Sequence, residues 1–175
     1  MRVHQNERLT LPGSVVAIGA FDGVHRGHQT VISEMVRTSR LEAVPSVVYT
    51  FYPPPRAYFQ GAQILTNSDE KIQLLKDLGV DHVVLARFDE AYLQRTADDF
   101  IKELSLINPK AVIVGKDFRF GNNRAGNLTS LRGHFPVRSM NSICCAKGER
   151  ISSTRIRELI LQGKKEQALP LLGWT

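Results

Sequence analysis

Residues 14–28 read SVVAIGAFDGVHRGH, an apolar run that passes into a glycine-rich loop. The run from Ser14 to Ala20 is rich in β-branched residues and does not alternate with polar ones, which is typical of a strand buried on both faces. Beyond the loop, Gln29 to Leu41 carries apolar residues at helical spacing. A buried strand followed by a loop and a helix indicates a βαβ unit, and hence a parallel sheet.

The rest of the chain continues this alternation of strands and helices. We predict strands at 46–51, 82–87 and 111–115, with one or two further strands from the candidates 137–139 and 143–146. Helices are predicted at 68–78, from Thr96 until Pro109 ends it, and at 154–161, with a short helical tail to 172. Ser68 is expected to cap the second helix and Gly79 to stop it. The run Pro53-Pro54-Pro55 is expected to be extended. Right-handed crossovers then give a Rossmann-like, doubly wound α/β fold in a single domain, residues 1–175.

Composition narrows the class of protein. A chain of 175 residues with 42% hydrophobic residues suits one globular domain, and no apolar run approaches the roughly 20 residues that span a bilayer. The adjacent Cys144 and Cys145 are too few for a disulfide framework, so we expect both to pack in a strand and the protein to be cytoplasmic. The formal charge of +6 fits solubility or a phosphorylated small-molecule ligand. No predicted helix carries a dense basic stripe, so a nucleic-acid partner is not expected.

The loop after the first buried strand has the features of a phosphate site. Gly19, Gly23 and Gly27 let the backbone approach a ligand closely, and the following helix presents unpaired N–H groups. His25 and His28 are three residues apart and share a face, where they could stabilise charge developing at phosphorus. The loop is neither a Walker A nor a dinucleotide fingerprint, because its spacing differs. No partnering motif supports a metal site at this histidine pair.

Two later segments could complete such a site. Residues 151–157 read ISSTRIR, in which three hydroxyls and two arginines gather at a predicted helix start. This segment is either an ordinary capping sequence or an anion site with Arg155 and Arg157 as phosphate ligands. Residues 115–121 read GKDFRFG directly after a predicted strand. Phe118 and Phe120 there belong either to the core or to a pocket for a flat ring.

Taken in order, these motifs resemble those of a known family. The first, G-x-FDGVH-x-GH from Gly19 to His28, resembles the signature of the HxGH nucleotidylyltransferase superfamily. The TFYPPPR loop at 50–56, the helix after Leu65-Thr66, and the segments at 115–121 and 151–157 resemble the FMN adenylyltransferase module of bacterial FAD synthetases. The resemblance covers about residues 14–173. It departs from the family at Pro54, where a polar residue is common.

The resemblance implies a fold of the HUP/nucleotidylyltransferase type and the reaction ATP + FMN → FAD + pyrophosphate, with Mg²⁺ accompanying ATP. The catalytic residues would be His25, His28 and Arg155. The ATP-binding residues would be Gly19, Phe21, Asp22, Gly27, Ser153, Thr154 and Arg157. The flavin-binding residues would be Phe51, Pro53, Asp117, Phe118, Arg119 and Phe120. No protein metal ligand is assigned.

Two alternatives remain open beside this function. The first is a nucleotidylyltransferase of the same fold that acts on another phosphorylated acceptor. The second is a non-catalytic regulator that binds a flavin or a nucleotide. We also expect no riboflavin kinase module, because the family's kinase motif is absent and the chain has room for one module. Oligomeric state cannot be read from the sequence.

Overall fold

A six-stranded parallel sheet forms the centre of the molecule. The computed structural model describes residues 1–5 and 8–174. The strands follow the order β1-β4-β3-β2-β5-β6, and every neighbouring pair is parallel. They span β1 (Arg2–His4), β2 (Ser14–Ile18), β3 (Ser46–Tyr52), β4 (His82–Arg87), β5 (Pro109–Gly115) and β6 (Val137–Met140). This architecture confirms the Rossmann-like, doubly wound prediction.

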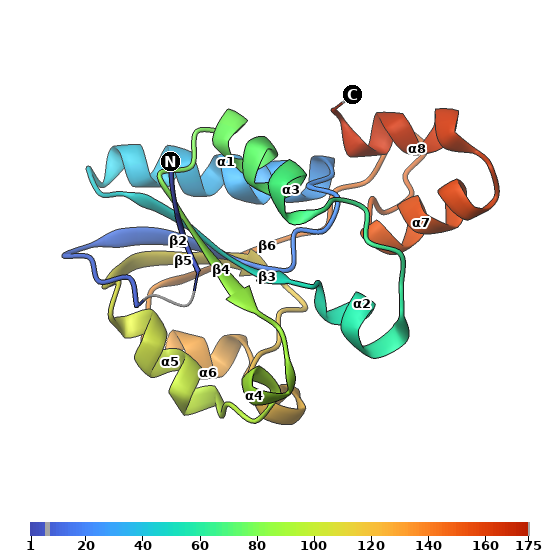
Figure 1. Cartoon of the computed structure of the whole chain (residues 1–175). Coiled ribbons are helices and arrows are strands. Elements are labelled where there is room, and N and C mark those ends of the chain that lie inside the picture. The colour runs from blue at the N-terminus through green and yellow to red at the C-terminus, as the bar shows by residue number, and fades with distance from the viewer. Residues whose placement is uncertain (6–7, 175) are drawn as a thin grey trace.

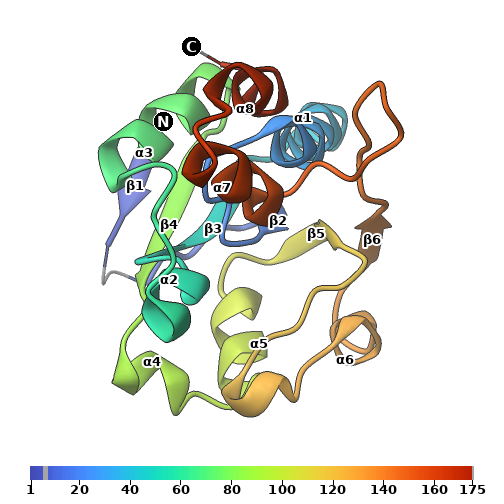
Figure 2. The same cartoon turned by 90° about the vertical axis from the view of Figure 1, so that its right-hand side faces the viewer.

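Helices cover both faces of the sheet (Figure 1). In Figure 1, α1 and α3 lie above it, and α5 and α6 lie below it. The helices are α1 (Arg26–Leu41), α2 (Pro55–Gln60), α3 (Ser68–Asp77), α4 (Glu90–Leu93), α5 (Ala97–Ser105), α6 (Leu128–Arg132), α7 (Ser153–Leu161) and α8 (Lys165–Leu172), with a 3₁₀ turn, η1, at Asn122–Arg124. The pair α7–α8 and the short α2 stand beyond the carboxyl ends of the strands (Figure 2).

Each face of the sheet contributes to a separate core. Val16 and Ile18 belong to a cluster with Phe100 and its apolar neighbours on α5, whereas Val15 and Ala17 belong to the cluster beneath α1 and α3. All five residues of β2 are buried, as the continuous apolar run predicted. A third, smaller cluster joins α7 to α8 through Ile156 and Leu171. The central strands are therefore fixed from both sides, and their carboxyl ends are rigid supports for loops.

Most predicted elements are confirmed, with several corrected boundaries. The helix α1 begins at Arg26, three residues earlier than predicted, because His25 caps it. Asn67, not Ser68, caps α3, in a reciprocal capping box with Glu70. Thr96 and Asp99 form a second reciprocal capping box, at α5.

Other predictions were wrong. Residues 143–146 do not form a strand, since Cys144 makes only one antiparallel bridge, to Arg150. The two cysteines are accordingly not packed in a strand: Cys144 is exposed and Cys145 half-buried. The third proline of the expected extended run, Pro55, starts α2, where its missing N–H costs nothing. Pro109 does not end a helix but opens β5.

No helix within residues 1–5 and 8–174 has both the length and the apolar character needed to cross a bilayer. The single-domain prediction includes residues 6, 7 and 175, which lie outside the described part of the chain.

Candidate active site

A cavity of about 450 Å³ opens at the carboxyl ends of β2 and β5. Here β3 and β5 flank β2 on opposite sides, so the loops after β2 and β5 diverge and leave a crevice. Its lining includes Gly19, Phe21, Asp22, Gly27, His25, His28, Phe51, Asp117, Phe118, Arg119, Ser153, Thr154 and Arg157. The topology thus brings together thirteen predicted site residues from four separate segments.

The two histidines of the β2–α1 loop (residues 19–25) and the first turn of α1 stack on each other. Their ring centroids are 3.6 Å apart and the planes differ by 17°. The His28 amide donates to Nδ1 of His25 at 3.3 Å, so the proton of a neutral His25 ring is on Nε2. Nδ1 of His28 is buried and has no hydrogen-bond partner in the described part of the chain. One ring therefore caps the helix, and the other lines the cavity with its Nδ1 enclosed behind it.

Both imidazoles are neutral at pH 7. Burial lowers the pKa of His25 to about 4. The pKa of His28 lies well below its ordinary value, chiefly because of burial and then because a charged ring would be repelled by a proton on His25 and by the Lys71 ammonium. A neutral imidazole offers one N–H donor. A bound phosphate would raise both pKa values, because a nearby anion favours the charged ring.

A buried ion pair connects the β2–α1 loop to α7. Asp22 pairs with Arg157 through Oδ2, and its Oδ1 accepts from the amides of Leu65 and Thr66 at 3.0 and 3.3 Å. Arg157 also donates through Nε to the carbonyl of Gln63 at 2.7 Å. These groups come from three parts of the chain. The pair therefore holds α7 and the segment before α3 against the loop.

Small residues and strained backbone shape this loop. A Cβ on Gly27 would stand 3.1 Å from the His25 ring, and one on Gly19 would stand 3.0 Å from the Phe21 ring. Phe21 and Val24 have φ values of 46° and 36°, a region that side chains other than glycine rarely adopt. Such strain is common at ligand-binding sites, where the surrounding structure enforces it.

The end of α8 is attached to the same loop. Gln29 donates through its amide nitrogen to the carbonyls of Val24 and Leu172, at 2.9 and 2.7 Å. The indole N–H of Trp174 donates to the carbonyl of Gly23 at 2.8 Å. The C-terminal helical pair is thus hydrogen-bonded to the backbone on which the cavity is built.

An aromatic cavity of about 850 Å³ adjoins the first one and shares the walls Phe51, Phe118 and Arg119 with it. Phe120 and Tyr92 line this second cavity and not the first. The rings of Phe118 and Phe120 are stacked, with centroids 5.7 Å apart. Phe120 packs in the core and Phe118 packs against the same cluster, while both also line the second cavity.

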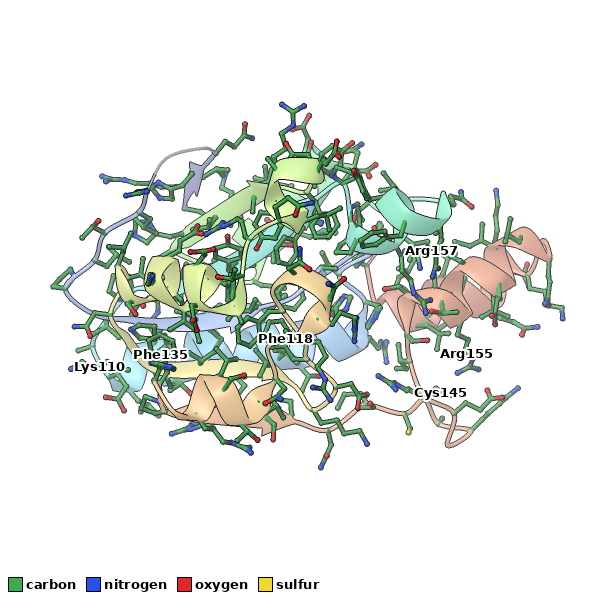
Figure 3. All side chains as sticks on the ribbon, turned by 90° about the horizontal axis from the view of Figure 1, so that it is seen from below. Lys110, Phe118, Phe135, Cys145, Arg155 and Arg157 are labelled. Atoms are coloured by element: carbon green, nitrogen blue, oxygen red, sulfur yellow. The ribbon has the colours of Figure 1, made fainter. Side chains whose placement is uncertain are left out.

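Two predicted residues, Arg155 and Pro53, line neither cavity. Arg155 pairs with Glu149 and contacts Sγ of Cys145 at 3.4 Å. Figure 3 shows Arg155 beside Cys145, with Arg157 apart from them. The roles assigned to Arg155 and Pro53 stay predictions.

Several cavity residues were missed from the sequence. Arg124 lines both cavities although it comes from η1, a turn without any motif that we singled out. Arg56 also lines both and hydrogen-bonds Thr154. Arg150 stands 3.4 Å from Asp117 and lines the first cavity. The GKDFRFG motif and the basic composition were the available signals. Neither of them shows which cationic side chains meet at the cavities.

Comparisons with known proteins agree with this geometry. A protein of Geobacillus thermodenitrificans, provisionally named a bifunctional riboflavin kinase/FMN adenylyltransferase, is 58% identical over 175 residues, covering 99% of this chain and 98% of that protein. The Escherichia coli K12 protein named bifunctional riboflavin kinase/FMN adenylyltransferase is 34% identical over 181 residues. The alignment covers 98% of this chain and 58% of the E. coli protein, so this chain spans somewhat more than half of that relative.

A solved structure has the same fold. It is titled a macrolide-efflux protein from Streptococcus pneumoniae, and it matches with a TM-score of 0.86 and 30% identity, covering 98% of this chain and 61% of that one. The sequence profile of the family described as FAD synthetase matches residues 7–155, which include the histidine pair, every lining residue of the two cavities except Arg157, and the start of α7. The chain belongs to the FAD synthetase family.

Proposed function

We propose that the protein is an FMN adenylyltransferase, which transfers AMP from ATP to FMN and releases pyrophosphate. The observation that carries the proposal is the shared wall of Phe51, Phe118 and Arg119 between a phosphate-type cavity and an aromatic cavity. A nucleoside triphosphate suits the first cavity, and the flat isoalloxazine ring suits the second. The single phosphate of FMN then lies at the shared wall and faces ATP.

The reaction needs positioning more than covalent participation by the protein. An oxygen of the FMN phosphate attacks the α-phosphorus of ATP, and the bond from that phosphorus to the bridging oxygen of the β-phosphate breaks. The electron pair leaves with pyrophosphate, so no enzyme-bound intermediate forms. Charge that develops on the α-phosphate is stabilised by the N–H of the neutral His28 ring and by amides in the first turn of α1.

Cations around the cavity suit the charge of the two substrates. Lys116, Arg124 and Arg150 line the first cavity in addition to the predicted residues. They attract the triphosphate and offset repulsion between it and the FMN phosphate. Ser153 donates to the carbonyl of Asp22 at 2.8 Å, which fixes the start of α7 beside the loop. This contact supports the proposal that the N-terminus of α7 binds the β- and γ-phosphates.

We propose Mg²⁺ as the metal that accompanies ATP. The described residues contain no group of three histidine, cysteine or carboxylate side chains with metal-binding geometry. Mg²⁺ usually binds through substrate phosphates, waters and one or two carboxylates, which fits a cavity with the exposed Asp117 at its edge. When bound, the ion neutralises charge on the leaving pyrophosphate. A cytoplasmic location stays a prediction.

The test is FAD formation by the purified protein supplied with ATP, Mg²⁺ and FMN. Riboflavin is the control acceptor, since it lacks the phosphate that attacks ATP, and it should remain unchanged. A panel of other phosphorylated acceptors covers the broader alternative. Turnover of another acceptor without FAD formation would reject FMN as the substrate, and binding without any turnover would favour a regulator.

A further inference from the structure

Lys71 is a charged side chain to which the mechanism above gives no task. It belongs to the first turn of α3 and is fully buried. Its ammonium group donates to the carbonyl of Ala20 at 2.8 Å and to that of Phe51 at 3.1 Å. Burial lowers the pKa of Lys71 to about 8, with Asp22 opposing the shift, so the group is mostly protonated at pH 7.

This is an unfavourable place for a cation. The first turn of a helix lies at the positive end of the helix dipole, where acidic residues such as Asp69 and Glu70 are favoured instead. Burying an ammonium also costs hydration free energy. The opposite charge nearby, Asp22, is already paired with Arg157. An apolar side chain of similar size at this position would often leave the protein equally stable. The reason for a lysine here therefore lies in the two carbonyl groups to which it donates.

The two carbonyls mark the starts of the loops that form the two cavities. Ala20 directly precedes Phe21 and the rest of the β2–α1 loop, and Phe51 forms part of the shared wall. Thr50 also donates to the carbonyl of Ala20, at 3.0 Å. From α3, Lys71 thus joins the β2–α1 loop (residues 19–25, the ATP loop) to the TFYPPPR loop (residues 50–56, the flavin loop).

We propose that Lys71 is a positioning residue that fixes the ATP loop and the flavin loop relative to each other. The inference rests on the proposed function. Attack requires the FMN oxygen to stand within about 3–3.5 Å of the α-phosphorus, and a misplacement of about 1 Å can cost 10²-fold in rate. Each loop can bind its own substrate without Lys71. What depends on Lys71 is the fraction of doubly bound enzyme in which the two reacting atoms are aligned.

The experiment compares Lys71→Met, Lys71→Arg and the matched control Lys76→Met, which removes an exposed lysine from the same helix. The single-turnover rate of FAD formation is divided by the number of binding-competent sites, counted from the stoichiometry of FMN titration. We expect Lys71→Met to lower this rate per site by about tenfold or more, while the dissociation constants of FMN and of a non-reactive ATP analogue change by less than about threefold.

Lys71→Arg keeps the charge but moves the donors, so its rate per site should fall about threefold, less than that of Lys71→Met. Lys76→Met should match the wild type. A merely structural lysine would lower the melting temperature or the number of competent sites and leave the rate per site unchanged. An unchanged rate per site in Lys71→Met, or in Lys71→Arg if the former does not fold, would overturn the proposal.

The wild-type and Lys76→Met proteins separate this proposal from the proposed function. If neither forms FAD, the adenylyltransferase function fails, and the role of Lys71 in that reaction fails with it. If both form FAD and the Lys71 variants react at the same rate per site, only the role of Lys71 is rejected.

Discussion

The rings of His25 and His28 are in contact but have different hydrogen bonds. His25 accepts a bond from the helix it caps, whereas the buried Nδ1 of His28 has no partner in the described chain. A buried polar atom without a bond costs about 1–3 kcal/mol. His28 lines the cavity and is only partly buried as a residue, so a phosphate oxygen there can accept from the N–H of its ring. We therefore assign the transition-state contact to His28 and the shaping of the loop to His25.

Substitution of His28 by Ala tests this division. We expect kcat to fall by about 10²-fold or more, because a donor to the developing charge is lost, with a much smaller change in the dissociation constant of FMN. Steady-state kinetics and FMN titration provide the measurement. The control is His134→Ala, which removes an exposed histidine outside both cavities. Equal kcat values with a lower melting temperature would show that His28 is structural.

The histidines also predict how stability depends on pH. The folded-state pKa of His25 is about 4, below the ordinary value of 6.5, so the unfolded chain binds more protons between these values. The contribution is fully present above pH 6.5 and is lost as the pH falls toward 4. It amounts to about 3 kcal/mol at most.

Urea denaturation at pH 7 and at pH 4.5 measures this effect. The difference in the free energy of unfolding between wild type and His25→Asn should shrink as the pH falls. A difference that is the same at both pH values would contradict the prediction.

Sequence reasoning identified the histidines but not Lys71. Two histidines around a glycine at a strand end are an unusual local pattern, so spacing alone indicated them. No local sequence pattern distinguishes a buried lysine in the first turn of a helix from a solvated one, and most lysines there are solvated. Its carbonyl partners lie 51 and 20 residues away in the chain, and only the folded structure brings them together.

At the scale of elements, α7 has two sides with different environments. Arg157 points to the buried carboxylate of Asp22, and Arg155 points to Glu149 on the more exposed side. The sequence predicted both arginines as phosphate ligands, because a helix start does not reveal which side faces inward. In this structure, Arg157 holds the helix in place and remains a lining residue of the cavity.

We expect Arg157→Met to lower the free energy of unfolding by about 3 kcal/mol, because it leaves Asp22 buried without its counter-ion. Denaturant titration measures the loss. Arg155→Met is the control on the same helix and should lose much less, since its partner Glu149 is largely exposed. Similar losses in the two variants would show that the Asp22–Arg157 pair does not anchor α7.

Among the elements, buried strands were easier to predict than short ones. β2 and β5 are runs of β-branched residues, and burial on both faces leaves that pattern in the sequence. β1 has three residues, pairs with one neighbour and was missed. The apolar run 143–146 predicts a strand, but in the structure it makes one isolated bridge and does not join the sheet.

At the scale of the whole molecule, the strand order determines where the substrates can bind. The chain reverses its direction of winding at β2, and the loops after β2 and β5 separate there. The sequence predicted a parallel sheet and hence this edge. It did not predict the size of the aromatic cavity, because α4 and η1 contribute to it and neither has a long-range pattern.

Ligand binding should therefore stabilise the folded domain as a unit. ATP with Mg²⁺, at about 100 times its dissociation constant, contributes about 2.7 kcal/mol, which raises the Tm of a domain of this size by about 5–10 °C. Thermal denaturation followed by circular dichroism measures the shift. Adenosine at the same concentration is the control and should give a clearly smaller shift. An equal shift with adenosine would argue against phosphate binding in the first cavity.

The hydrogen bond from Trp174 to the carbonyl of Gly23 gives the protein a built-in optical probe. Trp174 is the single tryptophan of the chain, so all indole emission comes from beside this one peptide group. A nucleotide that alters the loop changes the polarity around the indole and shifts its emission spectrum. A flavin absorbs light at the wavelengths that indole emits, so an occupied aromatic cavity quenches the same signal by energy transfer. Unlabelled protein can thus report each substrate separately.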